Sequence, residues 1–222
     1  MWVIMKEKTV LSLEIRRATV LIAAGILFLA GIIPTQAEDT TGQSVTETVY
    51  HADIFGRMNT NVIMLTQGAF RRWSGPLDPE YEMPSSYQQL GIALGVNPAY
   101  AQASIYGEWK PAKFIQIRLQ YDLQGYFGEN GALLSFPSDD AKFGKKEVDE
   151  LSGQEETGWG HRLLLQLVIT GKVGPVIIRN NTDLAYYRIG GRGPYFYEWE
   201  YDTLLKDGDF LINNMTAFLV EA

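Results

Sequence analysis

The sequence predicts an all-β fold, an antiparallel up-and-down transmembrane β-barrel of about eight strands. Three observations support this prediction: an export signal at the N-terminus, apolar and polar residues that alternate with a period of two along most of the remaining chain, and no sustained helical periodicity after the signal. Because successive side chains of a strand point to opposite faces of its sheet, such alternation gives each strand one apolar and one hydrated face.

Residues 1–37 have the order of a secretory signal peptide. An apolar run over residues 18–33 follows four basic side chains, Lys6, Lys8, Arg16 and Arg17. Pro34 ends the run, and the small-x-Ala motif at residues 35–37 predicts cleavage after Ala37. A retained membrane anchor is the alternative, but a spanning helix needs about 20 apolar residues, and this run has 16.

Cleavage after Ala37 would leave 185 residues, enough for one domain. Residues 38–47 are polar and are interpreted as a flexible leader, and residues 48–222 as the barrel domain. Residues 1–37 carry four basic and two acidic side chains, so their removal shifts the net charge from −7 to −9, which argues against a nucleic-acid partner. The chain has no cysteine, so an exported domain needs a means of closure other than disulfides.

Residues 99–110 and 115–127 give the clearest strand pattern, with a turn at residues 110–113 between them. In both segments the odd positions are apolar or small and the even positions are mostly polar. In a soluble sandwich the apolar row would face a core, whereas in a transmembrane barrel it faces lipid and the polar row lines the interior. Trp109 and Phe127 close the two apolar rows, as expected for interfacial aromatic girdles.

Seven further segments alternate less cleanly and bring the expected total to eight or nine strands: residues 49–57, 62–72, 87–96, 161–170, 176–187, 195–203 and 210–220. Short turns with glycine or proline join several of them. Two connections are long. Barrels alternate short periplasmic turns with longer outer loops, so residues 128–159 are expected on the cell exterior. Residues 74–86 fall on the nominally periplasmic side and do not fit this alternation.

Polar and charged side chains on the hydrated faces are the candidates for lining the interior. They carry both signs, which suits a hydrogen-bonded polar core in a small barrel or a water-filled channel in a larger one, and we favour the polar core. The candidates are Gln116, Arg118, Gln120, Asp122, Gln124, Arg162, Gln166, Arg179, Asn181, Asp183, Glu198 and Glu200.

The connection 128–159 carries eight acidic and three basic side chains. Acidic, oxygen-rich loops suit calcium, but the spacing matches no EF-hand, so we expect a solvated loop and predict no metal and no other cofactor. An enzyme would need a nucleophile oriented by a base. His51 and His161 are the two histidines, and neither has an evident partner, so no catalytic residue is predicted and the chain is not expected to be an enzyme.

The signal segment, the hairpin 99–127, the aromatic segment 195–201 and the acidic connection together resemble bacterial outer-membrane β-barrel proteins. Residues 83–87, 131–137 and 172–180 are similar to uncharacterised exported proteins of Gram-negative, delta-proteobacterial type. This resemblance implies an outer-membrane location, with membrane lipid and the barrel-assembly machinery as partners, and it brings no catalytic motif.

The expected function is therefore that of a structural or porin-like outer-membrane barrel, with no substrate indicated. A soluble periplasmic β-sandwich or lipocalin-like binding protein, its apolar face turned inward, is the first alternative, and an outer-membrane lipid-modifying enzyme is the second. Outer-membrane barrels usually finish on a strand with a terminal aromatic, whereas this chain ends in Glu221 and Ala222. The chain thus also fits a fragment of a larger barrel, and its oligomeric state is not indicated.

Overall fold

The computed structural model describes residues 3–9, 45–57, 62–78, 83–129, 132–198 and 200–220. The expected cleavage site at Ala37 lies outside these residues, as does most of the expected leader. The described chain is all-β apart from one short helix, α2 (Lys145–Glu150). Within it, no helix is long and apolar enough to cross a membrane.

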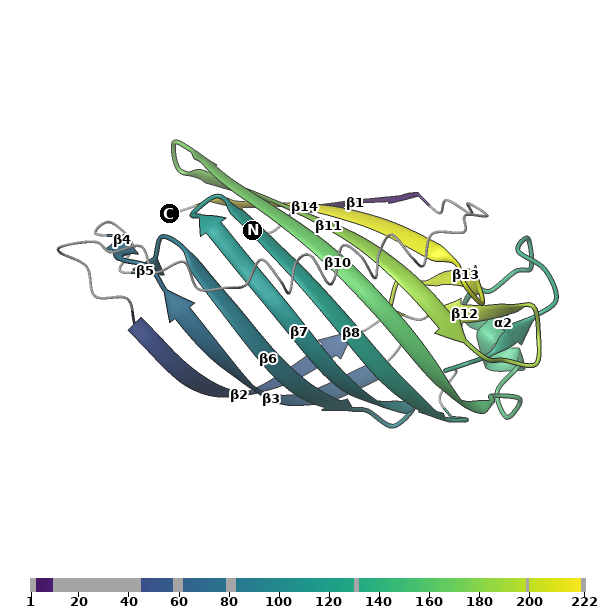
Figure 1. Ribbon diagram of the computed structural model, residues 1–222. Helices are drawn as coiled ribbons and strands as arrows, with labels where there is room; N and C mark the ends of the chain where they lie inside the picture. Colours follow the sequence, from purple (N-terminus) through teal and green to yellow (C-terminus); the bar gives the residue numbers. More distant parts are fainter. Residues whose placement is uncertain are drawn as a thin grey trace.

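One antiparallel sheet dominates the fold (Figure 1). Eight of its strands follow one another in chain order, each pairing with the next, and a ninth, β1, pairs with the last of them. The strands are β1 (Val3–Thr9), β2 (Val45–Arg57), β3 (Val62–Ser74), β6 (Tyr87–Val96), β7 (Tyr100–Ala112), β8 (Ile115–Phe127), β10 (Thr157–Val173), β11 (Val176–Ile189) and β14 (Phe210–Val220). The predicted up-and-down antiparallel order is confirmed.

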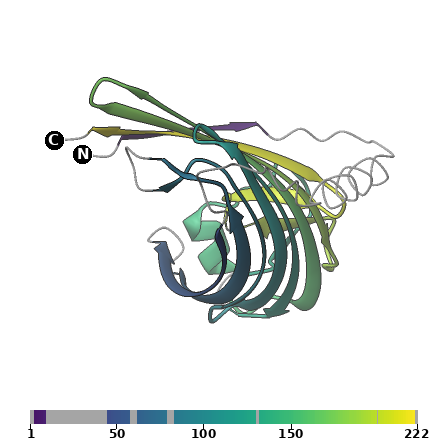
Figure 2. The same ribbon diagram turned by 60° about the vertical axis from the view of Figure 1, so that its left-hand side comes forward.

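The sheet curls strongly, so that it has a concave and a convex face (Figure 2). It is not closed into a barrel: β2 and β1 are its two edges in the described chain, and β2 pairs only with β3. The segment Val3–Thr9, inside the expected signal peptide, pairs antiparallel with the outer edge of β14.

Connections differ at the two ends of the sheet. At one end, two-residue turns at residues 113–114 and 174–175 join β7 to β8 and β10 to β11. Gly174 has a φ of 59°, a conformation that glycine adopts without the steric cost other residues meet. At the same end, within the long connection 75–86, β4 (Leu77–Asp78) pairs antiparallel with β5 (Met83–Pro84).

At the other end, the two longest connections fold together into what we term the cap, residues 132–156, 190–198 and 200–209. It contains α2 and a three-stranded sheet of β9 (Ser135–Phe136), β12 (Tyr195–Glu198) and β13 (Thr203–Lys206). Figure 2 shows α2 within the curl of the large sheet.

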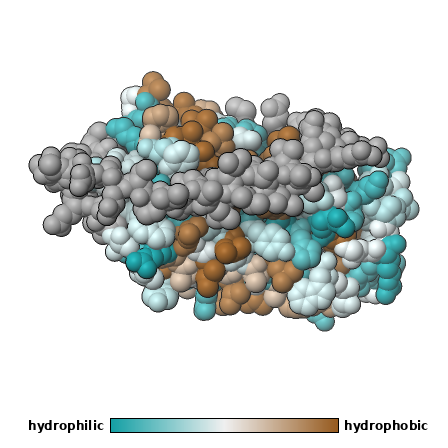
Figure 3. Space-filling model, viewed as in Figure 1, coloured by the Kyte–Doolittle hydropathy of each residue, from teal (hydrophilic) through white to brown (hydrophobic). Residues whose placement is uncertain are grey.

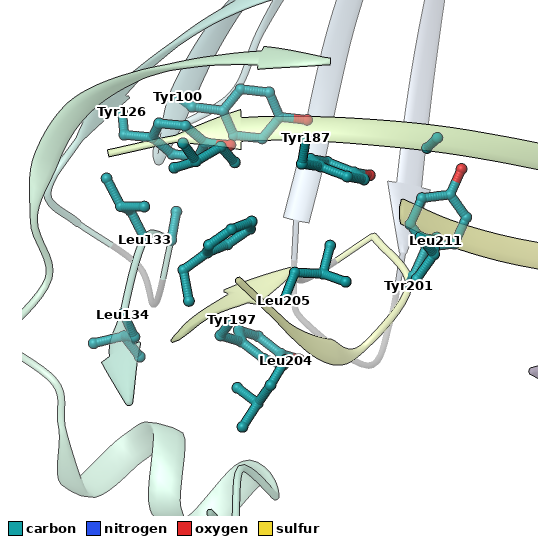
Figure 4. Packing of buried hydrophobic residues seen from close by; sticks show 14 of the residues in the cluster. Tyr100, Tyr126, Leu133, Leu134, Tyr187, Tyr197, Tyr201, Leu204, Leu205 and Leu211 are labelled. Atoms are coloured by element: carbon teal, nitrogen blue, oxygen red, sulfur yellow. The ribbon is translucent and has the colours of Figure 1, made fainter. Parts of the chain in front are cut away.

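Buried apolar side chains of the cap pack against the concave face of the sheet (Figure 4). Leu133, Leu134 and Leu205 from the cap join Tyr126 and Tyr187 from the wall in one cluster. Leu205 and Tyr187 are fully buried. Burying such side chains removes apolar area from water, at about 25 cal/mol per Å², and this holds the cap to the sheet.

Two sequence predictions are wrong at the cap. Residues 195–203 were expected to be a wall strand, but they form β12 and the turn into β13, outside the large sheet. The connection 128–159 was expected to be a solvated loop, but Leu133, Leu134 and Phe136 are buried. The physical reason is the apolar run 132–136, which a solvated loop would expose to water.

Candidate functional site

Outside the apolar cluster under the cap, the concave face of the sheet is largely polar, and it holds the candidate site. Ten of the twelve predicted interior residues lie on it, in β8, β10 and β11. The other two, Glu198 and Glu200, belong to the cap rather than to the wall. The register explains the grouping, because Arg162 lies opposite Asp122 and Gln166 lies opposite both Arg118 and Asp183.

A belt of polar side chains crosses the whole concave face along a single register row. It takes one residue from each of the eight consecutive strands, and each residue lies opposite the next. We call this row the polar belt: Glu47, Arg72, Gln89, Glu108, Arg118, Gln166, Asp183 and Asn213.

Above the belt, toward the cap, the carboxylate of Asp122 is fully buried. Its Oδ1 accepts hydrogen bonds from Gln102 Nε2 at 3.0 Å, Ser104 Oγ at 2.6 Å and Gln120 Nε2 at 2.7 Å. Its Oδ2 accepts from Arg162 Nε at 2.7 Å. A buried carboxylate is costly unless it is paired and hydrogen-bonded, and here four donors from three strands satisfy it.

Arg162 joins the wall to the cap. The guanidinium is buried on β10, and its Nη1 donates to a carboxylate oxygen of Glu200, which follows β12. One arginine thus bridges Asp122 of the wall and Glu200 of the cap.

Asp183 anchors a second cluster, within the belt. Its carboxylate accepts from Gln166 Nε2 at 2.9 Å, Asn181 Nδ2 at 3.2 Å, Tyr201 OH at 3.4 Å and Asn213 Nδ2 at 3.5 Å. Burial, and next the nearby Glu200 carboxylate, raise the pKa of the Tyr201 phenol in the cap well above its ordinary value. The phenol therefore stays protonated and remains a donor to Asp183.

On the side away from Asp183 the belt holds two arginines, each beside a carboxylate, with Gln89 between the two pairs. Arg72 Nε donates to Gln89 Oε1 at 2.9 Å, and its Nη1 lies 3.5 Å from Glu47 Oε1. Arg118 Nη1 lies 3.7 Å from the buried Glu108 carboxylate, and Arg118 stacks on the Tyr106 ring with its Cζ 3.9 Å from the centroid. The Tyr106 ring lies over Gly91, in the space that a Cβ would occupy.

Several members of these clusters were not among the residues predicted from the sequence. Gln102, Ser104 and Glu108 stand in the polar row of residues 99–110, so the same alternation that selected Gln120 and Asp122 could have selected them. Arg72 carried no such signal, because its strand alternates weakly. Glu47 was assigned to the expected leader, residues 38–47, whereas residues 45–47 belong to β2.

The two histidines lie on opposite faces. His161 is exposed on the convex face, where its Nδ1 lies 2.6 Å from Tyr121 OH. His51 faces the concave side of β2, with its Nε2 3.8 Å from Asp53 Oδ2. Among the described residues, no three His, Asp or Glu side chains gather as metal ligands.

The convex face is apolar over most of its area. Ile92, Leu94 and Ile105 expose 61%, 65% and 59% of their surface there. Figure 3 shows hydrophobic side chains over the strands in view and hydrophilic ones at the end that carries the cap. Trp109 lies toward the end with short turns, and Trp159 toward the cap.

Comparison of the chain with protein-family models, with curated proteins and with solved structures finds no match.

Replacing Glu200 with glutamine is expected to weaken docking of the cap by about 1 kcal/mol, because it removes one charge-assisted hydrogen bond that is partly screened by solvent. Amide hydrogen exchange in β12 and β13 should become faster, while exchange in β8 stays unchanged. Lys146→Gln is the matched control, since its ion pair with Glu150 is solvent-exposed. Equal exchange in the two variants would show that Arg162 does not hold the cap.

Proposed function

We propose that the eight strands from β2 to β14 form the wall of a bacterial outer-membrane barrel, with a polar interior that the cap occludes at one end. Residues 1–37 would direct export and be removed after Ala37. The observation that carries this proposal is the inverted polarity of the sheet: large aliphatic side chains are exposed on the convex face, and charged ones are buried on the concave face.

Water is a poor solvent for such a convex face. Soluble monomers rarely expose continuous apolar patches larger than a few hundred Å². In a bilayer the same side chains would contact apolar acyl chains instead of water, which removes the free-energy cost of their exposure. Trp109 lies opposite Ile117, and Trp159 lies opposite Gly125, eight residues farther along β8. Eight residues extend about 26 Å along a strand, or about 20 Å for a strand tilted by about 40°. The apolar band of outer-membrane barrels is about 25 Å tall.

Part of the convex face is polar. Asn180 and Thr182 of β11 face Asn214 and Thr216 of β14 there. These four side chains hydrogen-bond to one another at 2.7 to 3.2 Å. Mutual hydrogen bonds remove much of the cost of placing amides and hydroxyls against lipid, so this patch is compatible with a lipid-facing wall.

A wall in lipid requires its edges to be paired, because lipid offers no hydrogen-bond partners. The two end strands of the meander, β2 and β14, run antiparallel, as expected for an even number of alternating strands. Loss of β1 with the signal peptide would free the outer edge of β14 for β2. We propose that these two edges form the seam of the barrel.

The lipocalin-like alternative is less well supported, because a lipocalin needs an apolar concave face and this face carries the polar belt and the buried Asp122–Arg162 pair. The enzyme alternative needs a nucleophile, such as a serine, beside a base. In the described residues His161 contacts Tyr121 and His51 lies near Asp53. Neither contact includes a serine, so this alternative has little support. Between a pore and an occluded barrel, the apolar packing of the cap supports the occluded barrel.

Expression in a Gram-negative host is expected to yield a protein that starts at Glu38, fractionates with the outer membrane and migrates faster on a gel when unheated, because a closed barrel resists denaturation by detergent. Single-channel recording should show little conductance from the capped protein. A soluble periplasmic product without heat-modifiable migration would overturn the proposal.

Cysteine pairs test the seam, since the chain has no native cysteine. Tyr50→Cys on the convex face of β2, combined in turn with Ile212→Cys, Asn214→Cys or Thr216→Cys on β14, should give an intramolecular cross-link for at least one combination. The control pair is Tyr50→Cys with Ile92→Cys, two strands apart at about 10 Å, which should not cross-link. A heat-modifiable protein with no seam cross-link would mean that other strands complete the wall.

A further inference from the structure

Three cations converge on one part of the concave face, at the ends of the strands away from the cap. Arg72 Cζ and Lys110 Nζ lie 4.7 Å and 5.6 Å from the centroid of the Tyr87 ring. The Tyr87 hydroxyl donates to Glu108 at 2.5 Å, and Glu108 is also the carboxylate beside Arg118.

These cations outnumber the carboxylates around them. Glu108 is shared between the Tyr87 hydroxyl and Arg118, and Glu47, which faces Arg72, is partly exposed. Among the described side chains, Arg72, Lys110 and Arg118 thus meet two carboxylates, an excess of one positive charge.

Arg118 is incompletely hydrogen-bonded in the structure. Its guanidinium has five N–H donors, but its ion pair with Glu108, at 3.7 Å, is longer than a hydrogen bond. Its buried Nε has no hydrogen-bond partner among the described residues. The side chain is 29% exposed, so part of it can be reached from the interior.

Stacking holds this guanidinium in place. Its face lies on the Tyr106 ring, which in turn lies over Gly91. Stacking occupies the face of the guanidinium and not its planar edge, which matches the two oxygens of a carboxylate or phosphate. The arginine is therefore preorganised for an oxyanion.

We propose that this cluster is a binding site for a small oxyanion, a solute with a phosphate or carboxylate group, which Arg118 binds through its guanidinium edge with Arg72 and Lys110 adding positive charge. The orientation of the site rests on the proposed function: short turns mark the periplasmic side, so the solute would enter from the periplasm while the cap occludes the opposite end.

The experiment is calorimetric titration of the mature protein, folded in a non-ionic detergent, with inorganic phosphate and separately with acetate, in a chloride-free buffer. Saturable binding of either anion is expected, weakening as the ionic strength rises. The two titrations decide which oxyanion the site prefers. Arg118→Gln should weaken binding by about tenfold or more, and Arg72→Gln by less.

Arg71→Gln provides the matched control. Arg71 adjoins Arg72 on β3 but lies on the convex face, with its Cζ 5.8 Å from the Trp73 ring, so its removal changes the net charge equally and should leave binding unchanged. No saturable binding of either anion, or equal loss in Arg71→Gln and Arg118→Gln, would overturn the inference. Gel migration of each variant reports barrel closure separately, so failure of the binding site and failure of the proposed function are distinguishable.

Discussion

Replacing Arg162 with methionine is expected to lower the free energy of unfolding by about 3–5 kcal/mol, the usual cost of removing one partner of a buried ion pair. The variant leaves the Asp122 carboxylate with neutral donors alone, from Gln102, Ser104 and Gln120, in a fully buried position. It also removes the contact of the wall with Glu200. Urea unfolding in detergent micelles, followed by tryptophan fluorescence, measures the change.

Arg188→Met is the control for this effect. The pair of Arg188 with Asp207, at 3.3 Å, is exposed, and such pairs contribute about 1 kcal/mol or less. The double variant Arg162→Met with Asp122→Asn should recover much of the loss, because it removes the uncompensated charge. A loss in Arg162→Met no larger than that in Arg188→Met would show that the interior does not depend on this pair.

The second large effect is expected on the opposite face. Ile105→Arg should destabilise the protein folded in lipid vesicles by about 2–4 kcal/mol, the cost of an arginine on the lipid face of a barrel near the bilayer midplane. On a surface exposed to water the same change would be nearly neutral, since Ile105 is already largely exposed. Unfolding titrations in vesicles give the difference.

Gln116→Arg serves as the comparison for Ile105→Arg. Gln116 lies on the concave face at the end of β8 away from the cap, where an additional cation meets polar neighbours rather than lipid. The expected change is within about 0.5 kcal/mol. A reversed ranking of the two variants would mean that the convex face does not meet lipid, and the proposed function would fail.

The wall was predictable because period-two alternation is a strictly local signal. The predicted segments 87–96, 115–127 and 210–220 coincide with β6, β8 and β14. The polar row from Gln116 to Gln124 lies on one face as predicted, since alternation alone fixes which residues share a face. The predicted segment 161–170 is shorter than β10. Gly158 and Gly160 interrupt the apolar–polar alternation at the start of the strand, so the prediction began too late.

The cap was not predictable from the same signal. Alternation at residues 195–203 marks extended chain but does not say which sheet the chain joins, and the turn after β12, where Asp202 has a φ of 51°, ends the strand after four residues. The meeting of Arg162 with Glu200 depends on how the cap docks, a contact between segments 38 residues apart. Arg72 and Arg71 show a further limit: the alternation in β3 groups Arg71 with Gln67 as the polar face, whereas Arg72 is the arginine that lies on the concave face.

The order of strands in the sheet has a consequence for the time course of assembly. Every pair from β2 to β14 joins strands that are consecutive in the wall. Four of the seven connections have at most four residues, so these four hairpins can form with little loss of loop entropy. The proposed seam is different, because it brings the first and last of these strands together across the whole domain. Pairing of β2 with β14 should therefore be the slowest step of folding, and until it occurs both edges are open to other chains.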